Sequence, residues 1–191
     1  MNRPLTFLLS LTFLLFFSIP SLVLATTLEG KVIKVADGDT ITIMDDSGNK
    51  HRIRLGGIDA PEKDQPYGKE STQSLLELTS GKAVVIEYEK RDRYKRIIGK
   101  VLVDPPGEVF CMALDCVKKI DAGLEQIKKG LAWHYKKYQG EQSVEDRGTY
   151  GEAEVGARDK LLGLWMIEES IAPWKWRRRQ MKIKLRQSDG R

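Results

Sequence analysis

The chain has 191 residues, of which 41% are hydrophobic and 31% are charged, a balance typical of one globular domain with its own core. The net charge of +5 is unevenly spread: residues 174–191 hold eight Lys or Arg and one acid, whereas residues 26–173 hold 23 basic and 26 acidic side chains. Overall charge therefore does not indicate a nucleic-acid partner by itself, and it marks only the tail as a candidate contact.

Residues 1–25 have the pattern of a secretory signal peptide. Arg3 supplies the positive charge, Leu5 to Ile19 is apolar apart from four Ser and Thr residues, and Pro20 breaks any helix. Val23-Leu24-Ala25 then offers small residues for cleavage. The pattern predicts a secreted or periplasmic protein. The alternative is a membrane anchor formed by the uncleaved segment, since no later stretch is apolar enough to cross a bilayer.

The mature domain opens with strand signals. Leu28 to Val35 predicts a first strand, and Thr40 to Met44 alternates polar and β-branched residues. His51 to Ile58 alternates as well, and the turn formers Asp45 to Asn49 separate these two segments. This pattern predicts a β-hairpin.

The hairpin brings two acidic residues together. Asp39 precedes its first strand and Asp59 follows its second, so we expect the two carboxylates to be neighbours. Carboxylates held close repel one another unless a cation or a proton lies between them. A hard metal ion such as calcium suits a site made of oxygen ligands. Arg54 on the second strand could reach an anionic substrate held by that metal.

The middle of the chain continues the pattern of short elements. Gly68 to Ser80 predicts a helix that Gly81 can end. Ala83 to Tyr88 and Ile97 to Val103 predict two further strands, joined by the strongly charged connection Lys90 to Arg96.

The last third predicts helices. Asp121 can cap a helix that runs to Lys129. Residues 140–148 are polar and predict an exposed loop, and Thr149 to Glu152 has the form of a capping box that would begin the next helix. About five strands followed by helices favour an α+β fold, and a small oligonucleotide-binding barrel with helical cover is the plausible arrangement.

The cysteine pair and the basic C-terminal segment each allow two interpretations. Cys111 and Cys116 would form a small loop disulfide in an exported protein, although they could equally be free. The basic segment from Lys175 to Arg186 predicts a solvated or disordered end, with a contact to nucleic acid or anionic lipid as the alternative. We place the end of the folded domain at residue 178 and the tail at 179–191.

Two sequence stretches together resemble the signatures of the staphylococcal nuclease (thermonuclease) family. The first is DGDTITI from Asp37, followed after ten residues by RLGGIDAPE from Arg54, and the second is Asp92-Arg93-Tyr94-Lys95-Arg96. Weaker similarities run from Leu124 to Trp133 and through the closing PWKWR, so the resemblance covers roughly residues 28–178.

The resemblance implies a calcium-dependent phosphodiesterase for DNA and RNA, built on a five-stranded oligonucleotide-binding barrel with about three helices. It places calcium on the carboxylates of Asp39 and Asp59 and on the backbone carbonyl of Ala60, with Asp37 as a neighbouring acid. The catalytic residues that it implies are Arg54, Glu62 and Arg96.

The same resemblance implies the substrate contacts. Arg93 and Tyr94 match the region that cradles a nucleotide phosphate, and Tyr135 and Tyr138 are similar to base-stacking tyrosines of the family. The family usually has Gly at the position of Lys95. This difference affects the turn that orients the side chain of Arg96. The expected partners are single- or double-stranded DNA and RNA, bound by a monomer without a stable protein partner.

These residue types suit phosphodiester hydrolysis. A phosphodiester is an anion that repels hydroxide, and a metal acting as a Lewis acid reduces that repulsion. Arg54 and Arg96 can offer forked donors to the equatorial oxygens, and Glu62 can orient or deprotonate the attacking water. The alternative function is an inactive binding module of the same fold. An inactive module would be expected to lack some of these side chains, and none is missing.

Overall fold

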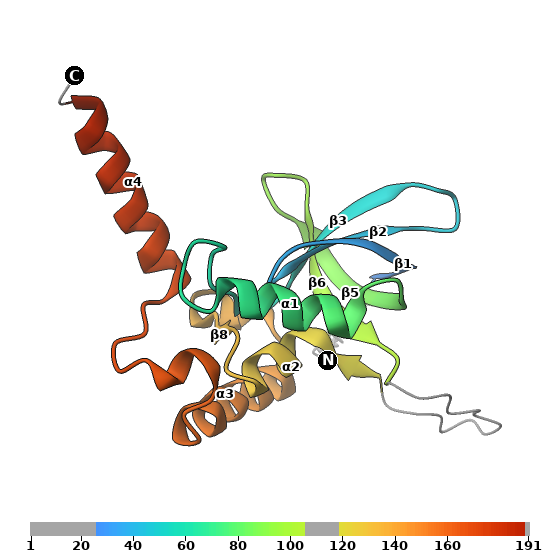
Figure 1. The fold of residues 1–191 in the computed structure, drawn as a ribbon. Coiled ribbons are helices and arrows are strands. Elements are labelled where there is room, and N and C mark those ends of the chain that lie inside the picture. The colour runs from blue at the N-terminus through green and yellow to red at the C-terminus, as the bar shows by residue number, and fades with distance from the viewer. Residues whose placement is uncertain (1–25, 106–118, 190–191) are drawn as a thin grey trace, which may run out of the picture.

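The computed structural model describes residues 26–105 and 119–189, and in both ranges the chain is folded into short strands and helices (Figure 1). The expected signal peptide and the expected Cys111–Cys116 pair lie outside the described residues. The strands are β1 Thr26–Asp37, β2 Thr40–Met44, β3 Lys50–Leu55, β4 Ile58–Asp59, β5 Ala83–Arg91, β6 Ile97–Val103, β7 Ile120–Asp121 and β8 Trp133–His134. The helices are α1 Gly68–Thr79, α2 Ala122–Lys128, α3 Val144–Asp159 and α4 Pro173–Asp189, with 3-10 turns η1 Lys136–Glu141 and η2 Gly163–Met166.

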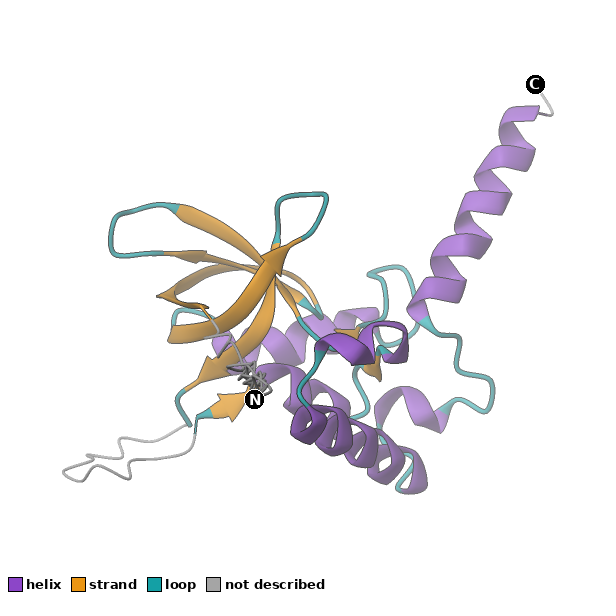
Figure 2. Ribbon diagram, turned by 180° about the vertical axis from the view of Figure 1, so that it is seen from behind, coloured by secondary structure: helices purple, strands orange, loops and turns teal. Residues whose placement is uncertain are grey.

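Five strands form a closed barrel. They are hydrogen-bonded in the order β3-β2-β1-β5-β6, and a parallel pairing of β3 with β6 closes the circle. In that pairing Ile53 lies opposite Ile97 and Arg54 lies opposite Ile98. The hairpin of β2 and β3 and the α+β oligonucleotide-binding barrel are therefore confirmed, and the helices gather on one side of the barrel (Figure 2).

Alternation along the strands builds the core. Every second residue of β6, from Ile97 to Val103, is buried, and Ile41, Ile43 and Ile53 contribute side chains with no exposed surface. Burying each such aliphatic side chain stabilises the fold by roughly 1.5–3 kcal/mol. The barrel is therefore a rigid support for residues at the strand ends.

Two helices hold the turn between β1 and β2 in place. The fully buried amide of Gln126, on α2, donates to the carbonyl of Gly38 at 3.0 Å and to the carbonyl of Ser71, on α1, at 2.8 Å. A side chain at Gly38 would meet the Ser71 hydroxyl at 1.9 Å, so glycine is required here for close approach of α1. This contact fixes the turn that leads into Asp39.

The predicted start of α3 was wrong. Ser143 caps the helix by accepting a hydrogen bond from the Asp146 amide at 3.0 Å, so the helix begins at Val144 rather than behind a capping box at Thr149. Thr149 lies inside the helix, where its hydroxyl donates to the carbonyl of Glu145 at 3.0 Å. The expected loop at 140–148 is accordingly divided between η1 and the first turn of α3.

The basic segment is a helix. We expected Lys175 to Arg186 to be solvated or disordered, but α4 runs through it from Pro173 and crosses the boundary that we drew after residue 178. Proline suits the first position of a helix because its missing N–H would have no partner there. The far end of α4 projects away from the rest of the fold (Figure 1). Of the helices that the structure describes, none combines the length and the apolar character needed to span a bilayer.

Candidate active site

Asp39 and Asp59 lie side by side, as the hairpin predicts, and one arginine joins them. Arg54 donates from Nη1 to Oδ1 of Asp39 and from Nη2 to Oδ1 of Asp59, each at 2.6 Å. Asp39 and Asp59 are 3% and 0% exposed. Two buried carboxylates next to each other are tolerated here because a forked guanidinium pairs with both.

Burial and ion pairing shift the pKa values of this cluster in opposite directions. Burial raises the pKa of Asp59, whereas the guanidinium groups of Arg177 and Arg54 favour its ionised form. Burial opposes the charge of Arg54, but Asp39 and Asp59 outweigh it and raise the pKa of this arginine. Burial and the charge of Asp39 together raise the pKa of Asp37 to about 6. Burial is therefore the main reason that the pKa values of Asp37 and Asp59 are raised.

Hydrogen bonds from a backbone amide and a hydroxyl hold the carboxylate of Asp39. Its Oδ2 accepts from the amide of Ala60 at 2.9 Å, and its Oδ1 accepts from the hydroxyl of Thr40 at 2.9 Å. The carboxylate of Asp37 in turn accepts from the amide of Asp39 at 3.2 Å. Ala60 is thus next to the acidic pair, and in this structure its amide is the group that contacts Asp39.

Glu62 joins the cluster through a residue that the sequence reasoning missed. Arg177, on α4, donates from Nη1 to Oε1 of Glu62 at 2.6 Å and from Nη2 to Oδ2 of Asp59 at 2.8 Å. These pairs tie the C-terminal helix to the loop after β4. Arg177 ends the PWKWR segment that resembles the family, but the sequence analysis assigned it no role, and 118 positions separate it from Asp59. The available signals were this segment and the contrast between an acidic folded domain and a basic C-terminal tail.

Arg96 makes no contact with the acidic pair in this structure. Its Nε donates to Oδ2 of Asp92 at 2.8 Å, and its guanidinium lies over the ring of Tyr94 at 5.6 Å from the centroid. Because Arg96 directly precedes Ile97, which pairs with Ile53, it emerges on the strand next to that of Arg54. The fold therefore brings Arg96 to the neighbouring strand and turns its side chain toward the tip of the β5–β6 hairpin.

The hairpin tip holds the other residues of this motif. Arg93 lies over the ring of Tyr94 at 5.0 Å, and Tyr94 is 65% exposed. Lys95 has a φ of 62°, the left-handed conformation that favours glycine. The left-handed backbone conformation explains why the family usually has Gly at this position. Lys95 adopts the same conformation, and its side chain makes that conformation strained.

The two expected base-stacking tyrosines contact each other edge to face at 5.1 Å. Tyr135 also stacks on Trp174, with ring centroids 5.2 Å apart and planes inclined by 19°. It lines a cavity of about 440 Å³, whereas Tyr138 lines a second one of about 350 Å³. Trp174, which belongs to the PWKWR segment of the sequence, is a second α4 residue at the site, and it packs on Tyr135.

The donor chemistry of the acidic pair fits calcium. Carboxylate oxygens of Asp39 and Asp59, together with the carbonyl of Ala60, would supply the hard ligands that this ion takes. Within residues 26–105 and 119–189 no group of three or more His, Cys, Asp and Glu side chains gathers around one point. A bound cation would share the carboxylate oxygens of Asp59 with Arg177, so the two compete for the same ligand.

The comparisons with known proteins identify the family of the chain. The family described as "Staphylococcal nuclease homologue" matches residues 52–167. An "Uncharacterized endonuclease" of Escherichia coli is 37% identical over 167 residues, which cover 87% of this chain and 95% of the relative. One of Haemophilus influenzae is 34% identical over 155 residues, covering 81% and 75% of the two chains. The "Micrococcal nuclease" of Shigella flexneri is 35% identical over 153 residues, covering 78% and 80%. The chain belongs to the staphylococcal nuclease family.

Proposed function

We propose that the protein is an exported, calcium-dependent nuclease that hydrolyses phosphodiester bonds of DNA and RNA. Relatives named endonuclease and micrococcal nuclease support the nuclease activity. The observation that carries the proposal is the bridge of Arg54 between two buried carboxylates, with Glu62 beside them. Export rests on the signal-like pattern of residues 1–25 alone.

The arginines would bind and orient the substrate phosphate. Arg54 carries a fixed charge on a planar fork, and Asp39 and Asp59 hold that fork in one orientation. A preorganised donor of this kind acts most strongly where negative charge increases in the transition state. Arg96 would add a second fork from the strand next to that of Arg54, with Asp92 holding its guanidinium through Nε and Nη2. Calcium, when bound, supplies Lewis-acid stabilisation of a non-bridging phosphate oxygen.

Glu62 would act on the attacking water. Its carboxylate is partly exposed, at 38%, so water can reach it, and Arg177 holds one of its oxygens. A carboxylate placed beside a phosphate can orient a water molecule or accept its proton. Arg177 links this group to Asp59, so the position of the water-activating carboxylate depends on α4.

Digestion of defined substrates tests the proposal. The chain is incubated with single-stranded DNA, double-stranded DNA and RNA, in calcium and in chelator, next to an Asp59→Asn variant. We expect fragments in calcium alone, and at most a trace from the variant. Intact nucleic acid under every condition would identify an inactive binding module instead. N-terminal sequencing of protein recovered outside the cell tests export: a new end near residue 26 supports cleavage, and an intact Met1 indicates an anchor.

A further inference from the structure

The helix α4 carries a dense cluster of positive charge. Its residues from Pro173 to Ser188 include seven Lys or Arg side chains and no Asp or Glu. Among the residues that the structure describes, Arg177 is the one member of this group that pairs with a carboxylate. The other positive charges of α4 are therefore uncompensated within the described part of the chain.

Helical spacing gathers five of these uncompensated side chains into one stripe. Residues separated by three, four, seven or eleven positions lie on the same face of an α-helix. The members of this basic stripe are Lys175, Arg178, Arg179, Lys182 and Arg186. They extend over about 16 Å of the helix, at about 1.5 Å per residue. Lys184 lies two positions from Lys182 and from Arg186, so it faces the opposite side of the helix.

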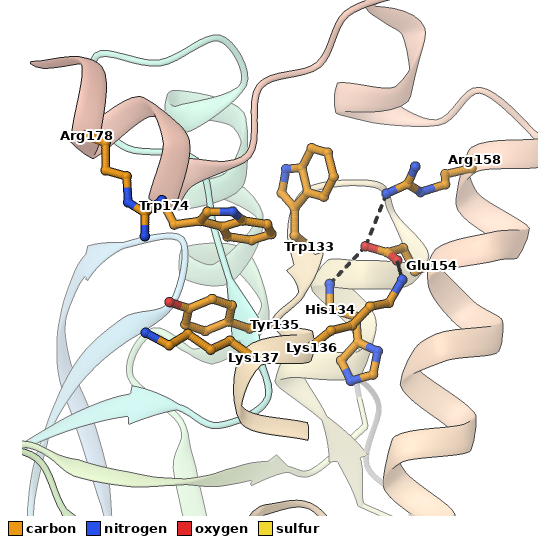
Figure 3. A pocket seen from close by; sticks show the side chains of 9 residues that line it. All are labelled: Trp133, His134, Tyr135, Lys136, Lys137, Glu154, Arg158, Trp174 and Arg178. Carbon is orange, nitrogen blue, oxygen red and sulfur yellow. Dashed lines mark hydrogen bonds and ion pairs between the residues drawn. The ribbon is translucent and has the colours of Figure 1, made fainter. Parts of the chain in front are cut away.

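The start of the stripe lies apart from the buried carboxylate in its neighbourhood. Glu154 pairs with Lys136 at 2.7 Å and with Arg158 at 3.6 Å. Figure 3 shows Arg178 next to Trp174, at the opposite side of the view from Glu154. Glu154 is thus occupied by other cations, and Arg178 stays available for an external anion.

The second half of α4 stands in solvent. Every residue from 181 to 188 is exposed, and Figure 1 shows this end of the helix projecting away from the barrel. Like charges four positions apart, such as those of Arg178, Lys182 and Arg186, repel one another and destabilise a helix. An anionic partner along the stripe would relieve this repulsion, and a partner with many regularly spaced charges would relieve it most.

The apolar residues of this half favour a partner other than a membrane. Met181 and Leu185, which are 65% and 56% exposed, share one side of the helix, whereas Ile183, 47% exposed, lies on another. A helix that binds at a bilayer surface needs one broad apolar face opposite its cations, and here Lys184 interrupts that face. The backbone of a nucleic acid binds cations without requiring such a face.

The same helix leads away from the acidic cluster of Asp39, Asp59 and Glu62. Arg177 contacts Asp59 at 2.8 Å and Glu62 at 2.6 Å, and the stripe continues from the next residue, Arg178, toward the free end of α4. A strand with one phosphate at the acidic cluster would therefore meet the stripe with the phosphates that follow.

We propose that the basic stripe binds the phosphate backbone of a nucleic acid outside the acidic cluster, so that long strands are held more tightly than short ones. A row of cations matches the regular negative charges of this backbone, and such contacts do not depend on the base sequence. This inference rests on the proposed nuclease function for the part of the strand that occupies the acidic cluster.

The salt dependence of binding provides the first test. A long labelled single-stranded oligonucleotide is titrated with the full chain carrying Glu62→Gln, in chelator, and anisotropy is recorded at several salt concentrations. We expect Lys182→Ala and Arg186→Ala each to reduce the slope of log affinity against log salt by about 0.7, the contribution of one phosphate contact on a single strand. Lys184→Ala removes an equal charge from the opposite side of the same helix and should leave the slope unchanged.

This matched control decides the outcome. A reduction in Lys184→Ala as large as in the two stripe variants, or no reduction in the stripe variants, would overturn the proposal. All three side chains are exposed and alanine is the strongest helix former, so the variants should keep α4 intact, which circular dichroism verifies.

Substrate length separates the stripe from the acidic cluster. Cleavage of a dinucleotide and of a long strand is measured in calcium, with Glu62 unchanged. Replacing both Lys182 and Arg186 by alanine should raise KM for the long strand about tenfold or more without changing kcat, because two backbone contacts are lost. The dinucleotide reaches only the acidic cluster, so its KM should not change. An equal rise in KM for both substrates would overturn the proposal.

Two further outcomes distinguish the alternatives. Vesicles of phosphatidylserine and phosphatidylcholine should bind Lys182→Ala and Lys184→Ala equally, and a loss of vesicle binding in Lys182→Ala with unchanged oligonucleotide binding would identify a membrane contact instead. No cleavage of any substrate by the parent protein contradicts the nuclease function. Cleavage of long strands with a KM that does not respond to the stripe variants contradicts the α4 proposal alone.

Discussion

Arg177 donates to both carboxylate oxygens of Asp59, from Nη1 at 3.2 Å and from Nη2 at 2.8 Å. One residue comes from the C-terminal helix and the other from a two-residue strand at the end of the barrel. Asp59 has no exposed surface, so its charge depends on such partners. The acidic cluster is therefore completed by α4, and any cation that binds Asp59 has to share it with Arg177.

Replacing Arg177 by alanine should make the protein depend more on calcium. In chelator the variant loses a partner of a buried carboxylate, and since the arginine is 43% exposed we expect a loss of about 1 kcal/mol. Calcium should bind roughly fivefold more tightly, because its competitor for Asp59 is gone. Thermal unfolding over a calcium titration measures both effects. Arg179→Ala is the control, and an identical calcium response in the two variants would show that Arg177 does not compete.

Arg54→Lys should inactivate the enzyme while leaving the charge in place. Lysine is a point charge that cannot bridge Asp39 and Asp59 at 2.6 Å each, as the fork does. We expect cleavage in calcium to fall about 10²–10³-fold, measured as kcat on a labelled oligonucleotide. Arg52→Lys, two residues earlier on the same strand and exposed, should retain activity. Full activity of Arg54→Lys would show that the charge alone is sufficient, and equal losses in both variants would contradict a role that is specific to the Arg54 bridge.

Asp92→Asn tests whether the hairpin tip positions Arg96. Asp92 accepts from Nε and Nη2 of Arg96, so the variant should lower kcat by about 10–100-fold with little change in KM. Burial would raise the pKa of Asp92, but hydrogen bonds from Arg96 and the backbone outweigh it and lower the pKa.

A lowered pKa gives this contact a defined pH dependence. The contribution of Asp92 to stability is present above its usual pKa of 3.8 and is lost as the pH falls below that value through the folded-state pKa. The difference in unfolding temperature between the parent and Asp92→Asn should therefore shrink on acidification. A difference that stays constant down to the acid limit would contradict this assignment.

Lys95→Gly should stabilise the fold. Lys95 adopts a φ of 62°, a conformation that costs a residue with a side chain about 1–2 kcal/mol. Glycine removes this strain, but part of the gain is offset because glycine loses more conformational entropy on folding. We expect a net gain of about 1 kcal/mol in urea unfolding. Arg93→Gly, in the same turn without a left-handed backbone, should destabilise, and a loss in both variants would show that no strain is relieved at Lys95.

Patterns that repeat locally made much of the fold predictable. Alternation in β2 and β3 identified the hairpin of the barrel, and Asp121 caps α2 as expected, accepting from the amides of Gly123 and Leu124. The proximity of Asp39 and Asp59 followed from hairpin geometry. Each of these inferences uses residues that are close in sequence or joined by one turn.

Long-range contacts were not predictable in the same way. Gln126 has an unremarkable place in a helix, yet it donates to the carbonyl of Gly38 across 88 positions. Arg177 ends the PWKWR segment, but its pairing with Asp59 joins residues 118 positions apart and depends on where α4 docks. Ser143 and Thr149 are both possible N-caps, and they lie within seven residues of each other. The helix begins after Ser143, where Glu145 and Asp146 place negative charge in the first turn.

The cleavage rate of Glu62→Gln in calcium tests the central claim most directly, because glutamine keeps the shape of the side chain and an oxygen that can accept from Arg177 but cannot take a proton from water. Single-turnover cleavage of a single-stranded oligonucleotide is compared with that of the parent, at equal calcium binding by calorimetry. The account predicts a fall of about 10²–10⁴-fold for Glu62→Gln, with Glu168→Gln, at an exposed position, unchanged. Cleavage by Glu62→Gln at the parent rate would show that the reaction takes place elsewhere or by other groups.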